Sequence, residues 1–270
     1  MMRLTILGCG SSGGVPRAGG PDGAGLWGDC DPAEPRNRRM RCSLMVERIG
    51  PSGTTSVLID TGPDLHRQLL LGRITRLDGV VYTHPHADHI HGIDDLRQVV
   101  HLMRSRIRLY ADAPTTEVLR ARFGYIFETP AGSPYPPICE MHAITRRFAI
   151  DGPGGPIQLR PFAVAHGGIP ALGFRIAAEG RNAAYLPDVS AIPDDAWPTL
   201  NGLDLFIIDA LQRRPHPTHA HLGQALDWIS RAAPARAVLT NMHIDMDYAT
   251  LCAELPQGVI PAHDGLVLEL

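Results

Sequence analysis

The chain alternates short apolar runs with glycine- and proline-rich turns, and this pattern predicts a mixed α/β protein. Runs of aliphatic and β-branched residues favour a pleated, half-buried backbone, whereas apolar residues three and four positions apart favour helices. The predicted strands cover residues 3–7, 43–48, 56–59, 79–82, 107–111, 141–149, 156–165, 172–177, 182–186, 205–209, 237–240 and 265–270. The predicted helices cover residues 64–71, 93–103, 115–123, 193–200, the segment after Gly223, and residues 248–255.

The strongest chemical signal is a histidine-rich segment that reads Thr-His-Pro-His-Ala-Asp-His-Ile-His-Gly over residues 83–92. It follows a buried strand and precedes a helix, which is where open α/β structures bind ligands. Imidazole and carboxylate groups bind zinc and similar metals. His84 and His86 can point the same way from an extended backbone, whereas the adjacent side chains of Asp88 and His89 diverge and suit a second metal. The alternative is a solvated, histidine-rich loop.

This segment resembles the motif of the metallo-β-lactamase superfamily of metal hydrolases. The resemblance implies three more ligands downstream, each at the end of a strand: a histidine, a bridging aspartate and a last histidine. Residues of these types close predicted strands in the implied order, namely His166, Asp188 and His243. The resemblance assigns the first metal to His84, His86 and His166, and the second to Asp88, His89 and His243, with Asp188 as the bridge. His91 is expected to support the site or to lie on the surface.

The resemblance covers essentially the whole chain and implies one domain, residues 1–270, with an α/β (α+β) fold: a four-layer αββα sandwich. Residues 7–16 and the segment around His221 are most similar to the PhnP-like phosphodiesterases, and more distantly to tRNase Z. In this branch a histidine ahead of a helix faces the substrate, which implies that role for His221, with His219 as the alternative in register. The family mechanism implies that Asp88 orients the nucleophile. PhnP itself holds a structural zinc, which is not expected here because Met246 stands where its histidine would follow the last ligand.

Composition narrows the partners and the cell compartment. A net charge of −3 gives no reason to expect binding to extended nucleic acid or to an anionic membrane. Five scattered cysteines without a CxxC motif fit a reducing cytoplasm. No run approaches the length of a membrane span, and no signal peptide is expected. The chain has no lysine, which excludes a Schiff base or a P-loop lysine. A homodimer is compatible with these features.

Four other features carry expectations. Residues 8–13 match the dinucleotide-binding motif G-x-G-x-x-G, but the glycines and prolines that follow cannot form the helix that such a site needs. We therefore expect a loop over the active-site mouth, whose N–H groups could bind a phosphate. Arg17 is a candidate substrate contact near this mouth. The basic run at residues 36–41 is interpreted as a solvated loop, with a phosphate contact as the alternative. Asp60 closes a strand and is expected to orient a ligand or the Thr83 loop.

The resemblance, together with the candidate ligands, implies a phosphodiesterase that holds two divalent metal ions, zinc by ligand type or manganese as the alternative. Its expected substrate is a small cyclic phosphodiester, such as a ribosyl cyclic phosphate or a molecule resembling a cyclic nucleotide. A hydroxide held between the two metals would attack phosphorus. The alternatives are hydrolysis of a carboxylic ester, thioester or lactam, a tRNase Z-like ribonuclease, and a metal-binding protein without catalytic activity.

Overall fold

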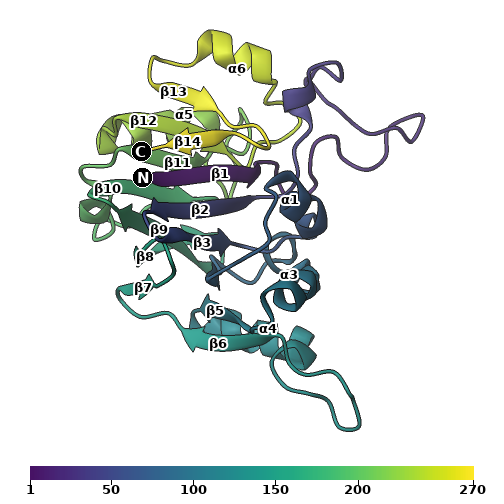
Figure 1. Ribbon diagram of the computed structural model, residues 1–270. Coiled ribbons are helices and arrows are strands. Elements are labelled where there is room, and N and C mark those ends of the chain that lie inside the picture. Colours follow the sequence, from purple (N-terminus) through teal and green to yellow (C-terminus); the bar gives the residue numbers. More distant parts are fainter.

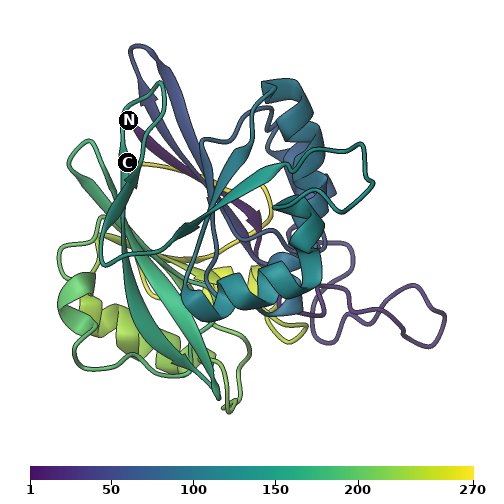
Figure 2. The same ribbon diagram turned by 90° about the horizontal axis from the view of Figure 1, so that it is seen from below.

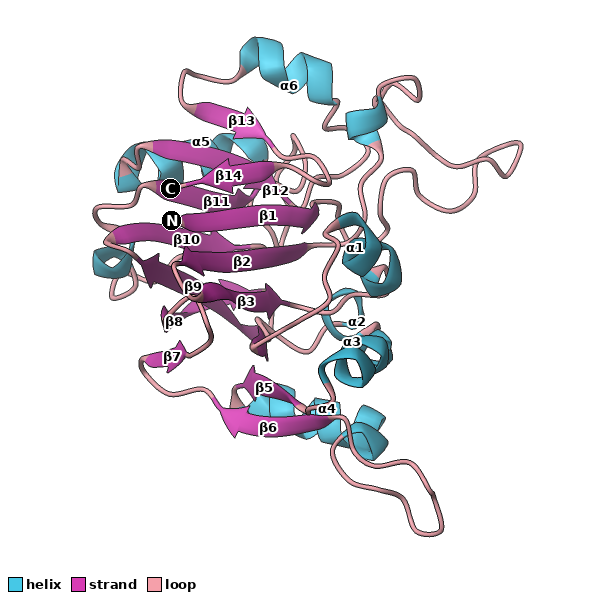
Figure 3. Cartoon of the chain, viewed as in Figure 1, coloured by secondary structure: helices cyan, strands magenta, loops and turns pink.

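Two seven-stranded β-sheets pack face to face in the computed structural model, which describes residues 1–270 (Figures 1 and 3). The first sheet has the strand order β14 (Val267–Glu269), β1 (Met2–Gly8), β2 (Ser43–Gly50), β3 (Gly53–Ile59), β4 (Gly79–Val81), β5 (Ile107–Ala111) and β6 (Cys139–Ala143). The second has the order β13 (Val259–Pro261), β12 (Arg236–Thr240), β11 (Leu205–Asp209), β10 (Arg181–Leu186), β9 (Ile169–Ala178), β8 (Ile157–His166) and β7 (Phe148–Ile150).

Helices cover the outer face of each sheet and complete the predicted four-layer αββα sandwich (Figure 2). The first sheet carries α1 (Leu65–Leu71), the short α2 (Ala87–Ile90), α3 (Leu96–Met103) and α4 (Ala113–Phe123). The second carries α5 (Leu222–Ala232) and α6 (Tyr248–Glu254). None of these helices has the length and apolar character needed to cross a membrane.

The alternation of side chains along the strands builds two separate cores. In β2, Leu44 and Val46 join the large core between the sheets, whereas Met45 joins the smaller core beneath α1, α3 and α4. In β3, Ile59 and Leu58 divide between the cores in the same way. Because successive side chains of a strand point to opposite faces, a strand buried on both sides must be apolar throughout. This explains why the central strands read as continuous apolar runs.

Two predicted elements differ from the structure. The single strand expected over residues 141–149 is two strands, β6 and β7, which lie at the edges of different sheets, because the chain crosses from one sheet to the other at residues 144–147. The helix expected over residues 193–200 is only a short 3₁₀ turn, Trp197–Leu200, which contains a proline without an N–H donor. The short strand β13 was not predicted.

The parallel strands of both sheets end at the same edge of the sandwich. β3, β4 and β5 are parallel neighbours, and so are β10, β11 and β12. The loops that leave these strands therefore meet at this edge, the position at which α/β folds bind ligands. Asp60 and Asn241 follow directly after β3 and β12, whereas His84 and Asp188 stand three and two residues after the ends of β4 and β10. The sequence positions predicted to carry the chemistry are thus brought together by strand topology.

Candidate metal centre

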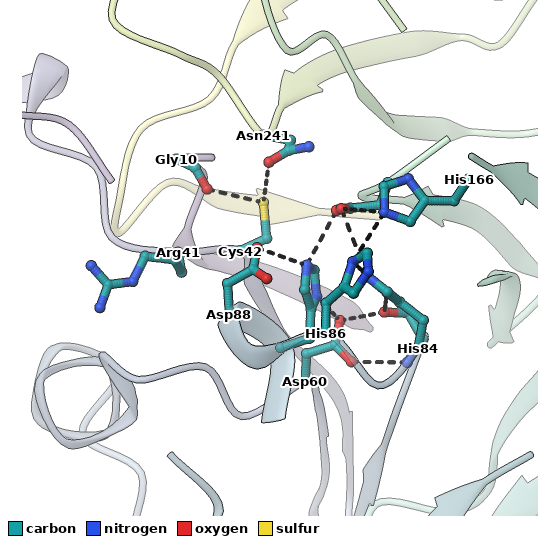
Figure 4. A network of polar contacts seen from close by, with 12 residues as sticks. Gly10, Arg41, Cys42, Asp60, His84, His86, Asp88, His166 and Asn241 are labelled. Carbon is teal, nitrogen blue, oxygen red and sulfur yellow. Dashed lines mark hydrogen bonds and ion pairs between the residues drawn. The ribbon is translucent and has the colours of Figure 1, made fainter. Parts of the chain in front are cut away.

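Three histidines and one aspartate converge on a single point (Figure 4). The Nε2 atoms of His84 and His166 lie 3.0 and 3.1 Å from Nδ1 of His86. Asp188 Oδ2 lies 3.8 Å from Nε2 of His84 and 3.5 Å from Nε2 of His166. Burial, followed by the nearby charge of His89, holds the pKa of His84 well below its usual range. His84 is therefore a neutral imidazole, the form that binds metals.

A second group shares Asp188 with the first. His89 Nε2 lies 3.2 Å from Asp188 Oδ1 and 3.4 Å from Asp88 Oδ2. Burial acts to lower the pKa of His89, but the carboxylates of Asp188, Asp88 and Asp60 raise it well above its usual range. Three buried or half-buried carboxylates around one imidazole create a strongly negative environment, which attracts cations.

The remaining nitrogen of each buried histidine is held by another protein group. His89 Nδ1 donates to Asp60 Oδ2 over 2.8 Å, and His166 Nδ1 donates to the carbonyl of Thr218 over 2.7 Å. Nδ1 of His84 lies 2.9 Å from the hydroxyl oxygen of Thr83. Histidines that bind metals typically have their second nitrogen fixed in this way, which sets the tautomer and the ring orientation.

Asp60 organises the centre as the sequence predicted. Besides His89, it accepts hydrogen bonds from the backbone N–H and the hydroxyl of Thr83, both over 2.8 Å. Asp60 has a φ angle of 64°, a backbone conformation that aspartate and asparagine adopt more readily than most residues. One fully buried carboxylate therefore fixes both a histidine and the loop that carries His84 and His86.

The donor set fits divalent metal ions. His89 Nε2 and Asp188 Oδ1 are buried and have no hydrogen-bond partner in the protein, although buried polar atoms normally have one. Imidazole nitrogens together with carboxylate oxygens are the ligands that zinc accepts. The first group would use His84, His86 and His166, the second would use Asp88 and His89, and Asp188 belongs to both.

His243 lines the same cavity but belongs to neither converging group. Its Nδ1 atom lies 3.6 Å from Oδ1 of Asp245. Its backbone N–H donates to the carbonyl of Leu211, which ties the loop after β12 to the loop after β11. The assignment of His243 to a second metal therefore stays a prediction.

The structure places His219, rather than His221, in the cavity. His221 is the N-cap of α5, where its Nδ1 accepts a hydrogen bond from Gln224 N over 3.4 Å, and it does not line the cavity. His219 lines the cavity and donates from Nδ1 to Asp209 Oδ2 over 2.9 Å. The alternative register, His219, thus takes the cavity position, because the helix begins immediately after His221 and uses this side chain as its cap; the substrate-facing role of either histidine stays a prediction.

Asp209 pairs with His219 inside the protein. It is fully buried at the end of β11 and also accepts hydrogen bonds from Asn241 Nδ2 and Val189 N, both over 3.1 Å. Burial raises the pKa of Asp209. Burial lowers the pKa of His219, but the hydrogen bond and the charge of Asp209 outweigh it, so that the pKa of His219 is raised. The sequence signal for Asp209 was a carboxylate at the end of a buried strand, next to the strands that precede Asp188 and Asn241.

The cavity in front of these residues has a volume of about 390 Å³, and two of its 15 lining residues are hydrophobic. Ser11, Ser12 and Arg17 form part of its wall, which agrees with the predicted loop over the mouth. His216 also lines it and was not singled out from the sequence. His91, by contrast, is exposed on the surface.

The glycines at residues 8–13 serve close packing rather than dinucleotide binding. A Cβ atom at Gly8 would lie 2.0 Å from the carbonyl oxygen of Arg41, and one at Gly10 would lie 2.9 Å from that of Arg39. The basic run that packs here is not simply a solvated loop. Arg39 is buried and donates to the carbonyl oxygens of His243 and Met246, which braces the loop that carries His243.

Comparison with known proteins agrees with this geometry. A model described as the β-lactamase superfamily domain matches residues 55–244. The crystal structure of a new diphosphatase from the PhnP family is 35% identical, with a TM-score of 0.85, and the match covers 100% of this chain and 98% of that one.

Two curated relatives match across only part of their own length. An octanoyltransferase of Porphyromonas gingivalis is 30% identical over 272 residues, which cover 98% of this chain and 51% of that protein. A ribonuclease Z of Gemmatimonas aurantiaca is 30% identical over 139 residues, 50% of this chain and 42% of the relative. The chain thus spans about half the length of the first of these relatives and less of the second. With a superfamily match over most of its length, the chain belongs to the metallo-β-lactamase superfamily of hydrolases, in which the PhnP-family diphosphatase is similar to it from end to end.

Proposed function

We propose that the protein is a phosphodiesterase that uses two divalent metal ions to hydrolyse a small phosphodiester, such as a ribosyl cyclic phosphate. The observation that carries the proposal is the pair of ligand groups joined by Asp188, which shares one polar cavity with His219. The similarity to the PhnP-family diphosphatase supports phosphate chemistry. Zinc suits the nitrogen and oxygen donors, with manganese as the alternative.

The metal ions would be held by His84, His86, His166, Asp188, Asp88 and His89, and by His243 in the second site. When bound, two such ions polarise a phosphate and lower the pKa of water toward neutrality. The protein supplies the rest of the chemistry. Asp88, in the wall of the cavity beside His89, accepts a hydrogen bond from the attacking water and orients it.

His219 would supply the proton that the leaving oxygen needs. Its Nδ1–H is engaged by Asp209, so a proton on Nε2 is the one available to a substrate. Because Asp209 raises the pKa of His219, the protonated ring persists closer to neutral pH. A general acid transfers its proton most efficiently when its pKa lies near the working pH. Arg17 in the same wall would bind the negative charge of the substrate.

The octanoyltransferase relative raises a second candidate, hydrolysis of an acyl ester or thioester. An eight-carbon chain would need an apolar pocket, since each buried methylene group contributes about 0.8 kcal/mol. Only Ile169 and Leu211 give the cavity apolar walls. The polar residues of the cavity favour phosphate as the reacting group. We infer that the substrate is a small molecule rather than an extended nucleic acid, and that the protein acts in the cytoplasm.

A substrate panel tests this proposal. The metal-loaded protein is incubated with bis(p-nitrophenyl) phosphate, a ribose cyclic phosphate, a 2′,3′-cyclic nucleotide, an octanoyl thioester and a β-lactam. We expect turnover of the phosphodiesters alone. Turnover of the thioester without any phosphodiester hydrolysis would replace the proposal by the acyl hydrolase.

A further inference from the structure

A second cavity lies apart from the metal ligands, between α1 and the basic run at residues 36–41. Its volume is about 340 Å³, which falls in the range of about 300 to 1,000 Å³ that small-molecule sites occupy. None of the residues in the two converging ligand groups lines it. The cavity is therefore a separate space, large enough for a small molecule.

Positive charge is concentrated in this cavity, although the whole chain has a net charge of −3. Its lining contains four arginines and two carboxyl groups, namely Arg38, Arg39, Arg41, Arg67, Asp64 and Asp264. Burial raises the pKa of Asp264 to about 7, so that a part of this group is uncharged at neutral pH. Guanidinium groups thus outnumber carboxylates by at least two to one, and this excess attracts anions.

The two outer arginines are not neutralised by the protein. Arg38 and Arg67 are exposed, and neither side chain forms a salt bridge or a hydrogen bond. Arg36, by contrast, lies in the same basic run and is paired with Glu34. The guanidinium carbon of Arg38 lies 4.7 Å from the ring centroid of Trp27. This stacking holds the side chain in place and leaves its N–H groups available.

The two inner arginines each carry a buried donor without a partner. Nε of Arg39 and Nε of Arg41 are buried and form no hydrogen bond. Arg41 Nε lies 2.9 Å from Asp64 Oδ2 but is not aligned with it, and that oxygen already accepts the backbone N–H of Arg41. The Arg41 side chain points away from the metal ligands (Figure 4). Buried donors without partners are rare and need an explanation, such as a bound ion.

We propose that these four arginines bind the phosphate group of a small effector molecule, at a site separate from the metal centre. Guanidinium groups match the geometry of phosphate oxygens and bind them through paired hydrogen bonds. Pro16 and the half-exposed Leu71 also line the cavity and would contact an organic part of the ligand. The phosphate comes either from a monoester of this kind or from inorganic phosphate. The inference goes beyond the proposed hydrolysis, because no step of that reaction uses this cavity.

Arg39 connects the cavity with the metal centre. Its backbone exchanges hydrogen bonds with Val15, over 3.0 and 2.9 Å, and its side chain donates to the carbonyl oxygen of His243 over 3.3 Å. His243 lines the metal-centre cavity, and Val15 lines the second one. A ligand that fixes Arg39 therefore acts on a segment that forms part of the metal-centre wall. Such coupling is reciprocal, so that metal binding changes the affinity for the effector by the same factor.

Calorimetry with matched variants tests the site. Glycerol 3-phosphate, inorganic phosphate and glycerol are titrated into the metal-loaded protein at about 150 mM salt, which screens non-specific attraction beyond about 8 Å. We expect both phosphates to bind and glycerol not to bind. The double variant Arg38→Gln/Arg67→Gln should weaken phosphate binding about 10- to 100-fold, the usual loss for hydrogen bonds to a charged group. Tighter binding of glycerol 3-phosphate identifies a monoester as the ligand, and equal affinity identifies inorganic phosphate.

A control removes the same charge elsewhere. Arg146 and Arg160 are exposed, form no salt bridge and do not line this cavity, so Arg146→Gln/Arg160→Gln should bind phosphate like the wild type. Phosphate held by the metal ions persists in both double variants, and only the binding lost from Arg38→Gln/Arg67→Gln belongs to this cavity. Equal affinity and stoichiometry in that variant and the wild type, or no binding to either, would overturn the site. The titration needs no turnover, so its result is independent of the proposed phosphodiesterase activity.

Kinetics test the effector role. kcat/KM for bis(p-nitrophenyl) phosphate is measured with and without glycerol 3-phosphate. We expect the added phosphate to change kcat/KM in the wild type and in Arg146→Gln/Arg160→Gln, and to have a smaller effect in Arg38→Gln/Arg67→Gln. The same change in all three proteins would place the effect at the metal ions and overturn the effector role.

Discussion

Asp60 Oδ2 lies 2.8 Å from Nδ1 of His89, and both side chains are fully buried. This hydrogen bond turns Nε2 of His89 toward Asp88 and Asp188, where a metal ion would bind. The other oxygen of Asp60 accepts the N–H of Thr83. The Asp60 carboxylate at the end of β3 therefore connects the two ligand groups: it holds His89 of one group and the Thr83 loop after β4, which carries His84 of the other.

Asp60→Asn tests this link with little change in shape, because asparagine also tolerates a positive φ angle. Asparagine cannot accept hydrogen bonds on its amide nitrogen, so it loses the contact of the Thr83 N–H if the nitrogen replaces Oδ1, or those of His89 and the Thr83 hydroxyl if it replaces Oδ2. We expect metal affinity to fall about 10- to 100-fold, as for other residues that orient a metal ligand. Competition with a chromogenic chelator measures this. Unchanged affinity for both metal ions would contradict the role of Asp60.

His219 and His221 provide a matched pair of substitutions. We expect His219→Ala to lower kcat by a factor of about 10² to 10⁴, the range for a general acid, with metal content unchanged. His221→Ala removes only a helix cap and should cost at most about 1 kcal/mol of stability, with kcat retained. Steady-state kinetics and thermal unfolding measure both effects. A greater loss of kcat in His221→Ala than in His219→Ala would restore the original sequence register.

His243→Ala tests the predicted metal ligand that lies outside both converging groups. If His243 completes the second site, its removal should lower the metal content from two ions per chain to about one, because the first group is left intact. Elemental analysis after dialysis gives the count. Two tightly held ions in the variant would show that His243 is only part of the cavity wall.

Asp264 predicts a pH dependence of stability. It accepts hydrogen bonds from Met40 N and Cys9 N, yet burial raises its pKa to about 7. The unfolded chain ionises Asp264 near pH 4, so between about pH 4 and 7 the folded state holds the extra proton. The free energy of unfolding should therefore fall as the pH rises through this interval and level off above it.

Asp264→Asn removes this titration while keeping the side-chain size. We expect the difference in unfolding free energy, wild type minus Asp264→Asn, to decrease from pH 5 to pH 8. Urea denaturation at both pH values measures it. A constant difference would show that Asp264 has an ordinary pKa in the folded protein.

The ligand groups were predictable because each residue stands at the end of an apolar strand. His166 and Asp188 could be found in this way. β8 and β10 both pair antiparallel with β9, so they run in the same direction and their carboxyl ends lie at one edge. The four-layer fold was predicted from the apolar pattern of the strands together with the family resemblance. The chain crossing at residues 144–147 could not be predicted, because the sequence does not show which sheet each half of an apolar run joins.

The roles of His219 and His221 could not be separated by sequence because they depend on where α5 begins. A shift of two residues in the helix start would exchange the cap and the cavity position. The sequence shows Asp209 as a carboxylate at the end of a strand. Its partner, His219, is identified only by the structure, in which the loop that carries His219 folds back over the strand end. The purpose of Gly13 likewise depends on a contact with Arg17 that no local pattern reveals.

The central claim is that phosphodiester hydrolysis depends on two metal ions joined by Asp188. The most direct test removes metal with a chelator and then titrates zinc or manganese into the protein while bis(p-nitrophenyl) phosphate hydrolysis is followed. We predict that hydrolysis is lost with the metal and returns fully only as the second equivalent binds, and that Asp188→Ala does not recover. Full activity with one equivalent, or two bound equivalents with no phosphodiester turnover, would contradict the account.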